Sequence, residues 1–506
     1  MIALVPRTRS SSRVVSSAVV VALVVVLGLL VATNVVFAVG FVGLGLIVAL
    51  AFVAPAVNLT LIVFFTAIVP FTVQNQLAGS GRGVIMSDLL LLTALMRVAP
   101  GVVAGATLNR RQRTVLIPLA AFVAIVILQF ARGIASGSDV STAGVELRTL
   151  MGFATFLVAI PLLRDENGRR QLLKGLLLTG LVLGLWGMAQ WVFDLRFEGE
   201  FGVREGIPFT TSGRGQLQGG MYAFPVAAIL GFAALVSGAV RQGRFRALVA
   251  TVTLLNLLCV LLTYERTFWV GTVVAMAFVA IRSGHGPRNR ALLWGPAIVF
   301  VVLAGMATLA PGALGAAQER LLSLGQYASD SSVRYRLVES EHVLDQIRAR
   351  PVLGSGLGAE IVWSRPWHGV PARSYHYTHN GYLWVAWKLG LPAALLLFGT
   401  LLAAIPRRPP PGYEPLLRSM HHGAQGALLL LMISSLTFPS FNTYGITATM
   451  GVLLALCTLR LRSSPRERSL PGARAPVSAV TARRAQGSHP GGAGSFCIRC
   501  TSISDR

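Results

Sequence analysis

The sequence predicts an all-α protein that crosses a membrane about 14 times, within a range of roughly 12 to 14, and carries one large loop on its outer side. Two observations predict this class. Of the 506 residues, 54% are apolar and 12% are charged, and the mean hydropathy is +0.66, a composition that the core of a water-soluble protein cannot absorb. Apolar runs also recur at lengths near the roughly 20 residues that a helix needs to cross about 30 Å of hydrocarbon.

The predicted spans divide the chain into four parts. Residues 1–310 form a first transmembrane region of about 11 spans, 311–379 an outer loop, 380–462 a region of about three spans, and 463–506 a basic cytoplasmic tail that we expect to be disordered. The first span follows basic residues and is expected to be a retained signal anchor, and merging it with the second would leave about thirteen spans. The approximate span centres are Val25, Leu46, Phe65, Leu92, Val123, Phe156, Leu181, Ala228, Leu255, Ala275, Phe300, Leu395, Leu430 and Leu453.

The basic residues support one orientation of these spans. The chain has 44 Lys and Arg against 19 Asp and Glu, a net charge of +25. Most of the excess lies at the N-terminus, in the tail and in alternate short connections, for example around Arg110, Arg169, Arg244 and Arg407. Short cytoplasmic connections carry such an excess. The pattern indicates topology and attraction to anionic lipids, so membrane lipids are expected partners and nucleic acid is not.

The outer loop is far longer than the other connections, and loops of this length are usually functional or disordered. Between residues 332 and 350, apolar side chains recur at helical spacing, and Pro351 marks a stop. The sequence therefore predicts an amphipathic helix on the outer membrane surface. Its apolar face would be formed by Val333, Leu337, Leu344 and Ile347.

Arg334 and Arg336 lie in the first turn of this predicted helix, where a cation opposes the helix dipole. Helix stability does not explain them. Free backbone N–H groups and two guanidinium groups at one helix end suit a phosphate. The alternatives are contacts with lipid headgroups or ion pairs with acids such as Glu339.

Three glycines follow the predicted helix, at Gly354, Gly356 and Gly358. No GK[ST] follows them and no predicted strand precedes them, so neither a P-loop nor a dinucleotide site is expected. Glycine most simply supplies tight turns, which would let the loop fold back onto the membrane region. Gly354, Gly356 and Asn380 are accordingly assigned to structural turns.

Four of the eight histidines, His342, His368, His376 and His379, lie in the outer loop. His379 stands at the water edge of the next span, where an imidazole can take a proton near neutral pH while the following helix holds it in place. The alternative is a histidine that only anchors the helix end. Neither the histidines nor the four cysteines have zinc-ligand spacing, so we expect no metal and no other cofactor.

Three further positions on the outer side are candidates. Arg266 follows Glu265 in a tight turn between two apolar runs, where charges are costly unless they pair or bind a ligand. Arg204 lies in the segment GVREGIPF. Asp88, at the outer end of the fourth span, is expected to belong to a structural ion pair.

Three stretches within roughly residues 200–400 resemble the O-antigen ligase and O-antigen polymerase family of bacterial membrane glycosyltransferases. Arg336 is followed fifteen residues later by PVLGSGLG, which is similar to the family's arginine, helix and "P-L-x-G-x-G-x-G" element. HNGYLWVAWKLG, which begins at His379, and the outer turn YERTFWVG resemble two further elements. Lys388, where the family often has an acid, and Glu265, where a small hydroxyl residue is common, depart from the pattern.

The resemblance implies a GT-C-like helical membrane fold on the cytoplasmic membrane. It also implies transfer of a glycan from an undecaprenyl-pyrophosphate carrier to a saccharide or glycolipid acceptor at the outer face, without a metal. The implied roles are proton transfer for His379 and pyrophosphate binding for Arg204, Arg266, Arg334 and Arg336.

Two other functions are compatible with parts of the pattern. A polymerase that joins repeat units on the same carrier would share the same residues. A transporter or flippase for a lipid-linked glycan would instead place charges near the bilayer midplane and show two related halves. The charges of this chain cluster outside the apolar runs, which favours a transferase.

Overall fold

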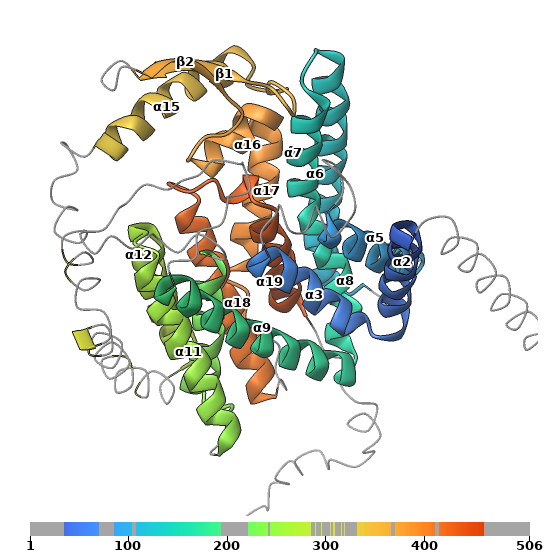
Figure 1. Ribbon diagram of the computed structural model, residues 1–506, viewed down its shortest axis with the longest axis vertical. Coiled ribbons are helices and arrows are strands. Elements are labelled where there is room, and N and C mark those ends of the chain that lie inside the picture. Colours follow the sequence, from blue (N-terminus) through green and yellow to red (C-terminus); the bar gives the residue numbers. More distant parts are fainter. Residues whose placement is uncertain are drawn as a thin grey trace, which may run out of the picture. The chain divides into compact units, whose positions relative to one another are not determined.

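A computed structural model of the protein describes residues 35–69, 85–103, 108–193, 221–240, 243–284, 331–365, 370–409 and 414–459, with single positions between 289 and 318. The described residues are mostly helical and include one pair of strands (Figure 1). In chain order the elements are α2 (Val35–Val53), α3 (Pro55–Ile68), α5 (Met86–Val103), α6 (Arg110–Ala135), α7 (Val140–Met151), η1 (Gly152–Ala154), α8 (Thr155–Arg164), α9 (Glu166–Val192), α10 (Ala223–Val236), α11 (Arg244–Leu262), α12 (Arg266–Arg282), α15 (Ser331–Ala349), β1 (Ile361–Arg365), β2 (Val370–Tyr375), α16 (Gly381–Leu389), α17 (Leu391–Ala404), α18 (Pro415–Ser434), η4 (Ser440–Asn442) and α19 (Tyr444–Thr458).

The helices agree with a membrane protein. Among the described residues, four are long and apolar enough to cross a bilayer: α6, the continuous run Val140–Arg164, α9 and α11. Each predicted span centre within the described residues falls in a helix, whereas Val25 and Phe300 lie outside them. The chain is therefore a helical membrane protein, and the larger number of spans stays a prediction.

Helix α19 lies at the centre of the packing, and every one of its residues is buried. It contacts α3, α7, α8 and α18. A Cβ atom on Gly451 would lie 2.9 Å from the carbonyl oxygen of Phe153, so α19 and the start of α8 meet backbone to backbone. The hydroxyl of Thr155 donates to the carbonyl of Ala448 at 2.6 Å across this contact. Such close packing of small residues is typical of helix pairs within a membrane.

Helix α6 connects the two ends of the helical region. Its 26 residues rise about 39 Å. It begins at a capping box, in which Asn109 accepts from the backbone N–H of Gln112 at 2.9 Å and the Gln112 side chain accepts from the backbone N–H of Asn109 at 3.1 Å. Its last turn contacts the glycine segment of the outer loop, and the neighbouring α7 starts at the N-cap residue Asp139.

The predicted outer loop contains a feature that the sequence did not predict. β1 and β2 form an antiparallel hairpin, with Ile361 opposite Tyr375 and Trp363 opposite Arg373, in a fold predicted to be all-α. Backbone pairing between the two strands satisfies polar groups of a segment that has no helical periodicity. Figure 1 shows the hairpin beside α15, over the start of α16, and both α16 and β1 contact α15.

The predicted helix of the outer loop is α15, which ends before Pro351, and only part of its predicted apolar face packs against the protein. The side chains of Leu337 and Leu344 are 61% and 37% exposed. Ile347 of the predicted face is buried, together with Glu339 and Val343, which precede it at four-residue steps. The reason is that α15 packs against α16 and β1. The row of side chains that faces this contact is buried, and it includes the carboxylate of Glu339.

Candidate active site

The start of α16 holds His379 in a fixed place. Asn380 is the N-cap of this helix, and its side-chain oxygen accepts from the backbone N–H groups of Tyr382 at 3.0 Å and Leu383 at 3.1 Å. The N–H of Gly381 donates to the carbonyl of Ser435 at 2.8 Å. These bonds fix the backbone on the C-terminal side of His379.

Glu339 of α15 fixes His379 from the other side. One carboxylate oxygen accepts from the backbone N–H of His379 at 2.9 Å and from the hydroxyl of Thr378 at 3.0 Å. Both carboxylate oxygens lie 3.2 Å from Nδ1 of the imidazole. The Glu339 side chain is only 1% exposed, against 27% for His379. The buried carboxylate of Glu339 thus contacts both the backbone and the imidazole of His379.

The pairing determines which ring nitrogen can act as a base. An ionised carboxylate only accepts hydrogen bonds, so Nδ1 of a neutral His379 carries the proton that faces Glu339. The lone pair then lies on Nε2, to which no described residue forms a hydrogen bond. The rings of Tyr335 and Tyr377 lie at 5.4 Å and 5.6 Å from the His379 ring and flank it. This arrangement suits proton removal from a substrate hydroxyl.

Arg336 lies one turn before Glu339 on α15. Its Nε is buried and has no hydrogen-bond partner among the described residues. Leaving a buried donor unsatisfied costs about 1 to 3 kcal/mol, so the position suits an anionic ligand. Arg334 is exposed. Neither arginine pairs with Glu339, because that carboxylate accepts from Thr378 and His379 instead.

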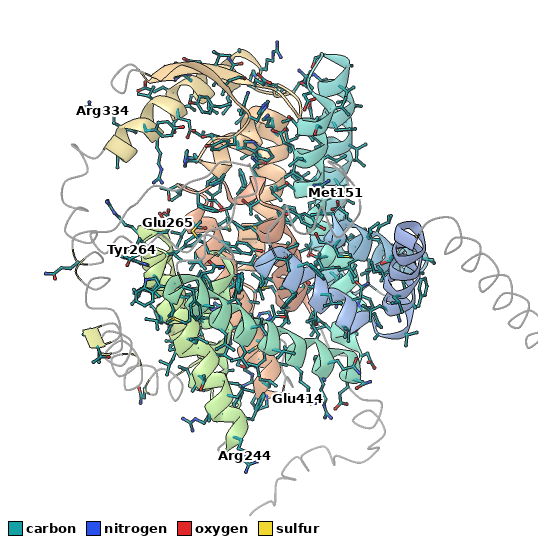
Figure 2. All side chains as sticks on the ribbon, in the orientation of Figure 1. Met151, Arg244, Tyr264, Glu265, Arg334 and Glu414 are labelled. Carbon is teal, nitrogen blue, oxygen red and sulfur yellow. The ribbon has the colours of Figure 1, made fainter. Side chains whose placement is uncertain are left out.

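Arg266 begins α12 at the same end of α18 as the start of α16. The hydroxyls of Thr267 and Thr437 lie 2.5 Å apart, and the rings of Phe268 and Phe438 lie 5.4 Å apart. This turn after α18 also includes Ser435, which accepts from the start of α16. In Figure 2, Glu265 marks the end of the α11–α12 pair that is nearer to Arg334, and Arg244 marks the far end. No described contact joins Arg266 to Arg336.

The turn before Arg266 is strained. Tyr264 is a non-glycine residue with φ at +53°, a conformation that costs roughly 1 to 3 kcal/mol, and its side chain is 3% exposed. Burial raises the pKa of its hydroxyl. The packing around Tyr264 maintains this backbone conformation, and the chain continues from it into Glu265 and Arg266. The remaining arginine candidate, Arg204, lies outside the described residues.

The glycine segment forms turns against α6 and the end of α16. Gly354, Gly356 and Gly358 have φ at +63°, +91° and +76°, which L side chains rarely adopt. A Cβ atom on Gly354 would lie 2.5 Å from the backbone nitrogen of Gly390. Arg132 of α6 donates to the carbonyls of Leu353 at 2.6 Å and Gly354 at 3.0 Å. The segment is therefore held on one side by backbone contact with the end of α16 and on the other by the Arg132 side chain of α6.

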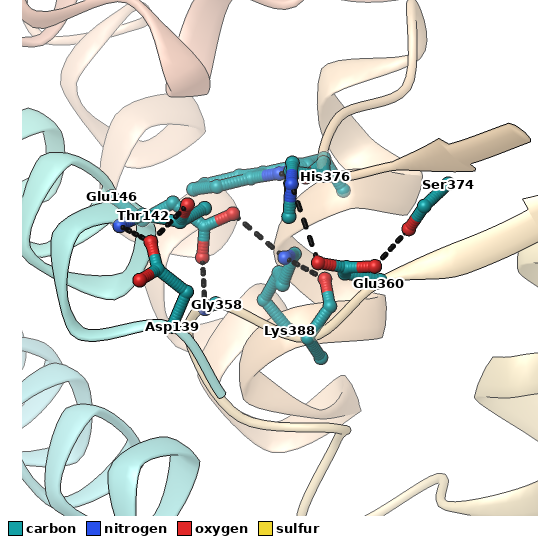
Figure 3. A network of polar contacts seen from close by, with 10 residues as sticks. Asp139, Thr142, Glu146, Gly358, Glu360, Ser374, His376 and Lys388 are labelled. Atoms are coloured by element: carbon teal, nitrogen blue, oxygen red, sulfur yellow. Dashed lines mark hydrogen bonds and ion pairs between the residues drawn. The ribbon is translucent and has the colours of Figure 1, made fainter. Parts of the chain in front are cut away.

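A buried ion pair lies beneath this segment (Figure 3). Nζ of Lys388 lies 2.7 Å from the carboxylate of Glu146 on α7 and donates to the carbonyl of Ala359 at 2.5 Å. The other oxygen of Glu146 accepts from the N–H of Gly358 at 2.6 Å. The side chains are 0% and 3% exposed. The pair connects α7, the glycine segment and α16, which accounts for the lysine that departs from the family pattern.

His376 belongs to this second network and not to the one around His379. Its Nε2 lies 3.5 Å from the carboxylate of Glu360, to which Ser374 also donates. Its carbonyl accepts from Nε1 of Trp384 at 3.2 Å. Of the other predicted positions, Asp88 forms the expected ion pair, with its carboxylate 2.9 Å from Arg148.

Three residues that hold the site are not predicted from the sequence in this role. Glu339 is predicted there only as an arginine partner, and Arg132 and Glu146 are not among the predicted site residues. A signal for Glu339 exists, because it continues the row of Val343 and Ile347 at four-residue steps. For Glu146 the signal is a single acid in a mostly apolar run, which is costly in a membrane unless it is paired.

Residues 249–398 match a family model described as O-antigen ligase. The matched stretch includes Arg266, α15, the glycine segment and His379, and it confirms the family resemblance that the motifs predicted. Arg132 and Glu146 precede it. A search of curated proteins gives no match.

Proposed function

We propose that the protein transfers a glycan from an undecaprenyl-pyrophosphate carrier to a hydroxyl group of an acceptor at the outer face of the cytoplasmic membrane, since residues 249–398 match a family model described as O-antigen ligase. The observation that carries the proposal is the Glu339–His379 pair. It presents an oriented imidazole at the N-terminal end of α16, and Arg336, one helical turn before Glu339 on α15, adds a buried Nε that has no described partner.

In the proposed reaction, Nε2 of His379 takes the proton of the acceptor hydroxyl. The acceptor oxygen forms a bond to the anomeric carbon of the donor sugar, and the bond from that carbon to the pyrophosphate oxygen breaks. The electron pair leaves with undecaprenyl pyrophosphate, and the proton leaves later from the imidazolium. Glu339 orients the ring and stabilises the positive charge that forms on it.

The leaving group determines the role of the arginines. Negative charge develops on the pyrophosphate as the bond breaks, and guanidinium groups placed in advance stabilise it without reorganisation. Arg336 is best placed for this role, because its buried Nε has no described partner. We assign Arg266 and Arg334 to the same pyrophosphate, with Arg204 as a further candidate.

The test is complementation of a strain that lacks the gene, with lipid-linked glycan measured in its membranes. Loss of the protein should cause glycan to accumulate on the lipid carrier. The parental gene should reverse this, and His379→Ala should not, because a positioned base contributes about 100- to 10,000-fold in rate. His376→Ala is the matched control, since it removes a neighbouring imidazole from the other network, and it should complement.

The accumulated glycan also separates the proposal from its alternatives. Long chains on the carrier indicate loss of a ligase, and single repeat units indicate loss of a polymerase. A flippase would instead leave the glycan on the inner side of the membrane, out of reach of an external glycosidase. Complementation by His379→Ala at the parental level would refute the assignment of the base.

Glu339→Gln tests the positioning role separately. The glutamine amide can face Nδ1 with its N–H₂ group, which would put the ring proton on Nε2 and remove the base. We expect a loss of about 10- to 100-fold, the worth of one charge-assisted hydrogen bond. Parental transfer by this variant would show that the carboxylate has no such role.

A further inference from the structure

A group of cations lies at the end of α6 that is remote from the candidate site. Arg111 lies in the first turn of α6, Arg282 in the last turn of α12, and Arg407 three residues after the end of α17. From Arg111 to Gly133, where the glycine segment packs, α6 rises about 33 Å. This rise is close to the about 30 Å thickness of the hydrocarbon layer. Arg111, Arg282 and Arg407, here called the arginine cluster, therefore lie at the membrane face opposite to the outer loop.

Hydrogen bonds bring the three side chains to one turn. Arg282 donates from Nη2 to the carbonyl oxygens of Pro406 at 2.8 Å and Arg407 at 3.2 Å. Arg111 donates from Nη1 to the carbonyl of Arg408 at 2.9 Å. Arg407 donates from Nη1 to the carbonyl of Arg111 at 3.3 Å. Three guanidinium groups from three elements of the fold are thus held around residues 406–408.

The partners of the arginine cluster are neutral. Its hydrogen bonds go to backbone carbonyls and to the hydroxyl of Thr114, and within the described part of the chain no carboxylate forms an ion pair with any of the three. Burial lowers the pKa of Arg407, and the like charge of Arg111 acts in the same direction. Three partly buried positive charges in one place repel each other. A bound anion would attract all three and offset this repulsion.

The chemistry of the arginine cluster selects the anion. Each guanidinium has five N–H donors in a planar fork, and the bonds to carbonyl and hydroxyl oxygens occupy only some of them. Such forks bind phosphate in a bidentate manner. We propose that the arginine cluster is a phosphate-binding site, filled either by the headgroup of an anionic phospholipid in that leaflet or by a soluble phosphate compound. Basic pockets between membrane helices bind lipid headgroups in this way.

The experiment measures ligand-induced stabilisation of the purified full-length protein in a zwitterionic detergent at constant ionic strength. Three additives are titrated: short-chain phosphatidylglycerol, phosphatidylcholine with the same chains, and inorganic phosphate. We expect a saturable rise in Tm with one of the two anionic phosphate sources, phosphatidylglycerol or inorganic phosphate, and no such rise with phosphatidylcholine, because its choline group neutralises the phosphate charge. A rise with phosphatidylglycerol alone assigns the site to lipid, and a rise with inorganic phosphate assigns it to a soluble anion.

Variants test whether the response comes from the arginine cluster. Arg111→Gln removes a cation that makes only one described hydrogen bond from its side chain, so it should fold and should weaken the apparent Kd about 10- to 100-fold. Arg407→Lys keeps the charge, loses the fork and should weaken binding less. Arg244→Gln removes the same charge from an exposed arginine at the start of α11 and should leave the Kd unchanged. Equal effects of Arg111→Gln and Arg244→Gln, or no saturable response to either phosphate source, would overturn the proposal.

Discussion

Breaking the Glu146–Lys388 pair should destabilise the protein far more than removing both charges. Lys388→Met keeps the length of the side chain but leaves the carboxylate of Glu146, which is 3% exposed, with the N–H of Gly358 as its one remaining described partner. An uncompensated buried charge costs about 3 to 5 kcal/mol. Glu146→Gln should cost a similar amount, because it leaves the ammonium buried.

The double variant Glu146→Gln/Lys388→Met should recover about 2 kcal/mol relative to either single variant. Its glutamine oxygen still accepts from Gly358. The remaining cost, about 1 to 3 kcal/mol, comes from the carbonyl of Ala359, which loses the donor that Lys388 supplied. The pair connects α7 to α16, so glycan transfer should fall in both single variants and recover partly in the double variant.

The measurement is the unfolding free energy in mixed micelles, followed by tryptophan fluorescence and by loss of helical circular dichroism. The matched control is Arg170→Gln, which breaks the exposed pair with Glu166, whose side chains are 70% and 60% exposed, and which should change stability by less than about 0.5 kcal/mol. The reasoning is refuted if the double variant is as unstable as the single variants, or if Lys388→Met unfolds like the control.

Three further predictions concern the glycine segment, Arg336 and the start of α7. Gly354→Ala should cost more than about 1 kcal/mol of stability because of its positive φ and close backbone neighbours, whereas Gly399→Ala, in a helix with open space around it, should not; equal melting temperatures would contradict this. Arg336→Lys should insert normally and lose about 10- to 100-fold of transfer, with Arg348→Lys as the unaffected control. The backbone N–H and the hydroxyl of Thr142 donate hydrogen bonds to Asp139 and lower the pKa of its carboxyl group. The stability that ionised Asp139 contributes to the fold is therefore present above the ordinary pKa of about 4 and is lost as pH falls through the lowered value. Asp139→Asn should flatten that part of the acid-unfolding curve, and an unchanged curve would exclude the contribution.

Local patterns in the sequence were sufficient for the helices. Apolar runs predicted a helix at each described span centre, and Pro351 predicted the end of α15, because hydrophobic periodicity and helix termination depend on neighbouring residues. The side-chain types of Arg336 and His379 likewise predicted the chemistry that we propose for them. The hairpin β1–β2 was not predicted, because its strands show no alternation of apolar and polar residues and pair mainly through the backbone.

Contacts between distant residues depended on the tertiary structure. Glu339 and His379 are separated by 40 residues, Arg132 and Leu353 by 221, and Glu146 and Lys388 by 242. No sequence periodicity relates residues so far apart. The packing between helices decides which polar side chains are buried together and therefore hydrogen-bond to each other. Local patterns in the sequence were enough to predict a helical membrane protein with arginines and a histidine outside the apolar runs. Only the packing of α15 on α16 determined that Glu339 pairs with His379 rather than with an arginine, because a buried carboxylate takes the donors that the surrounding structure places within hydrogen-bond distance.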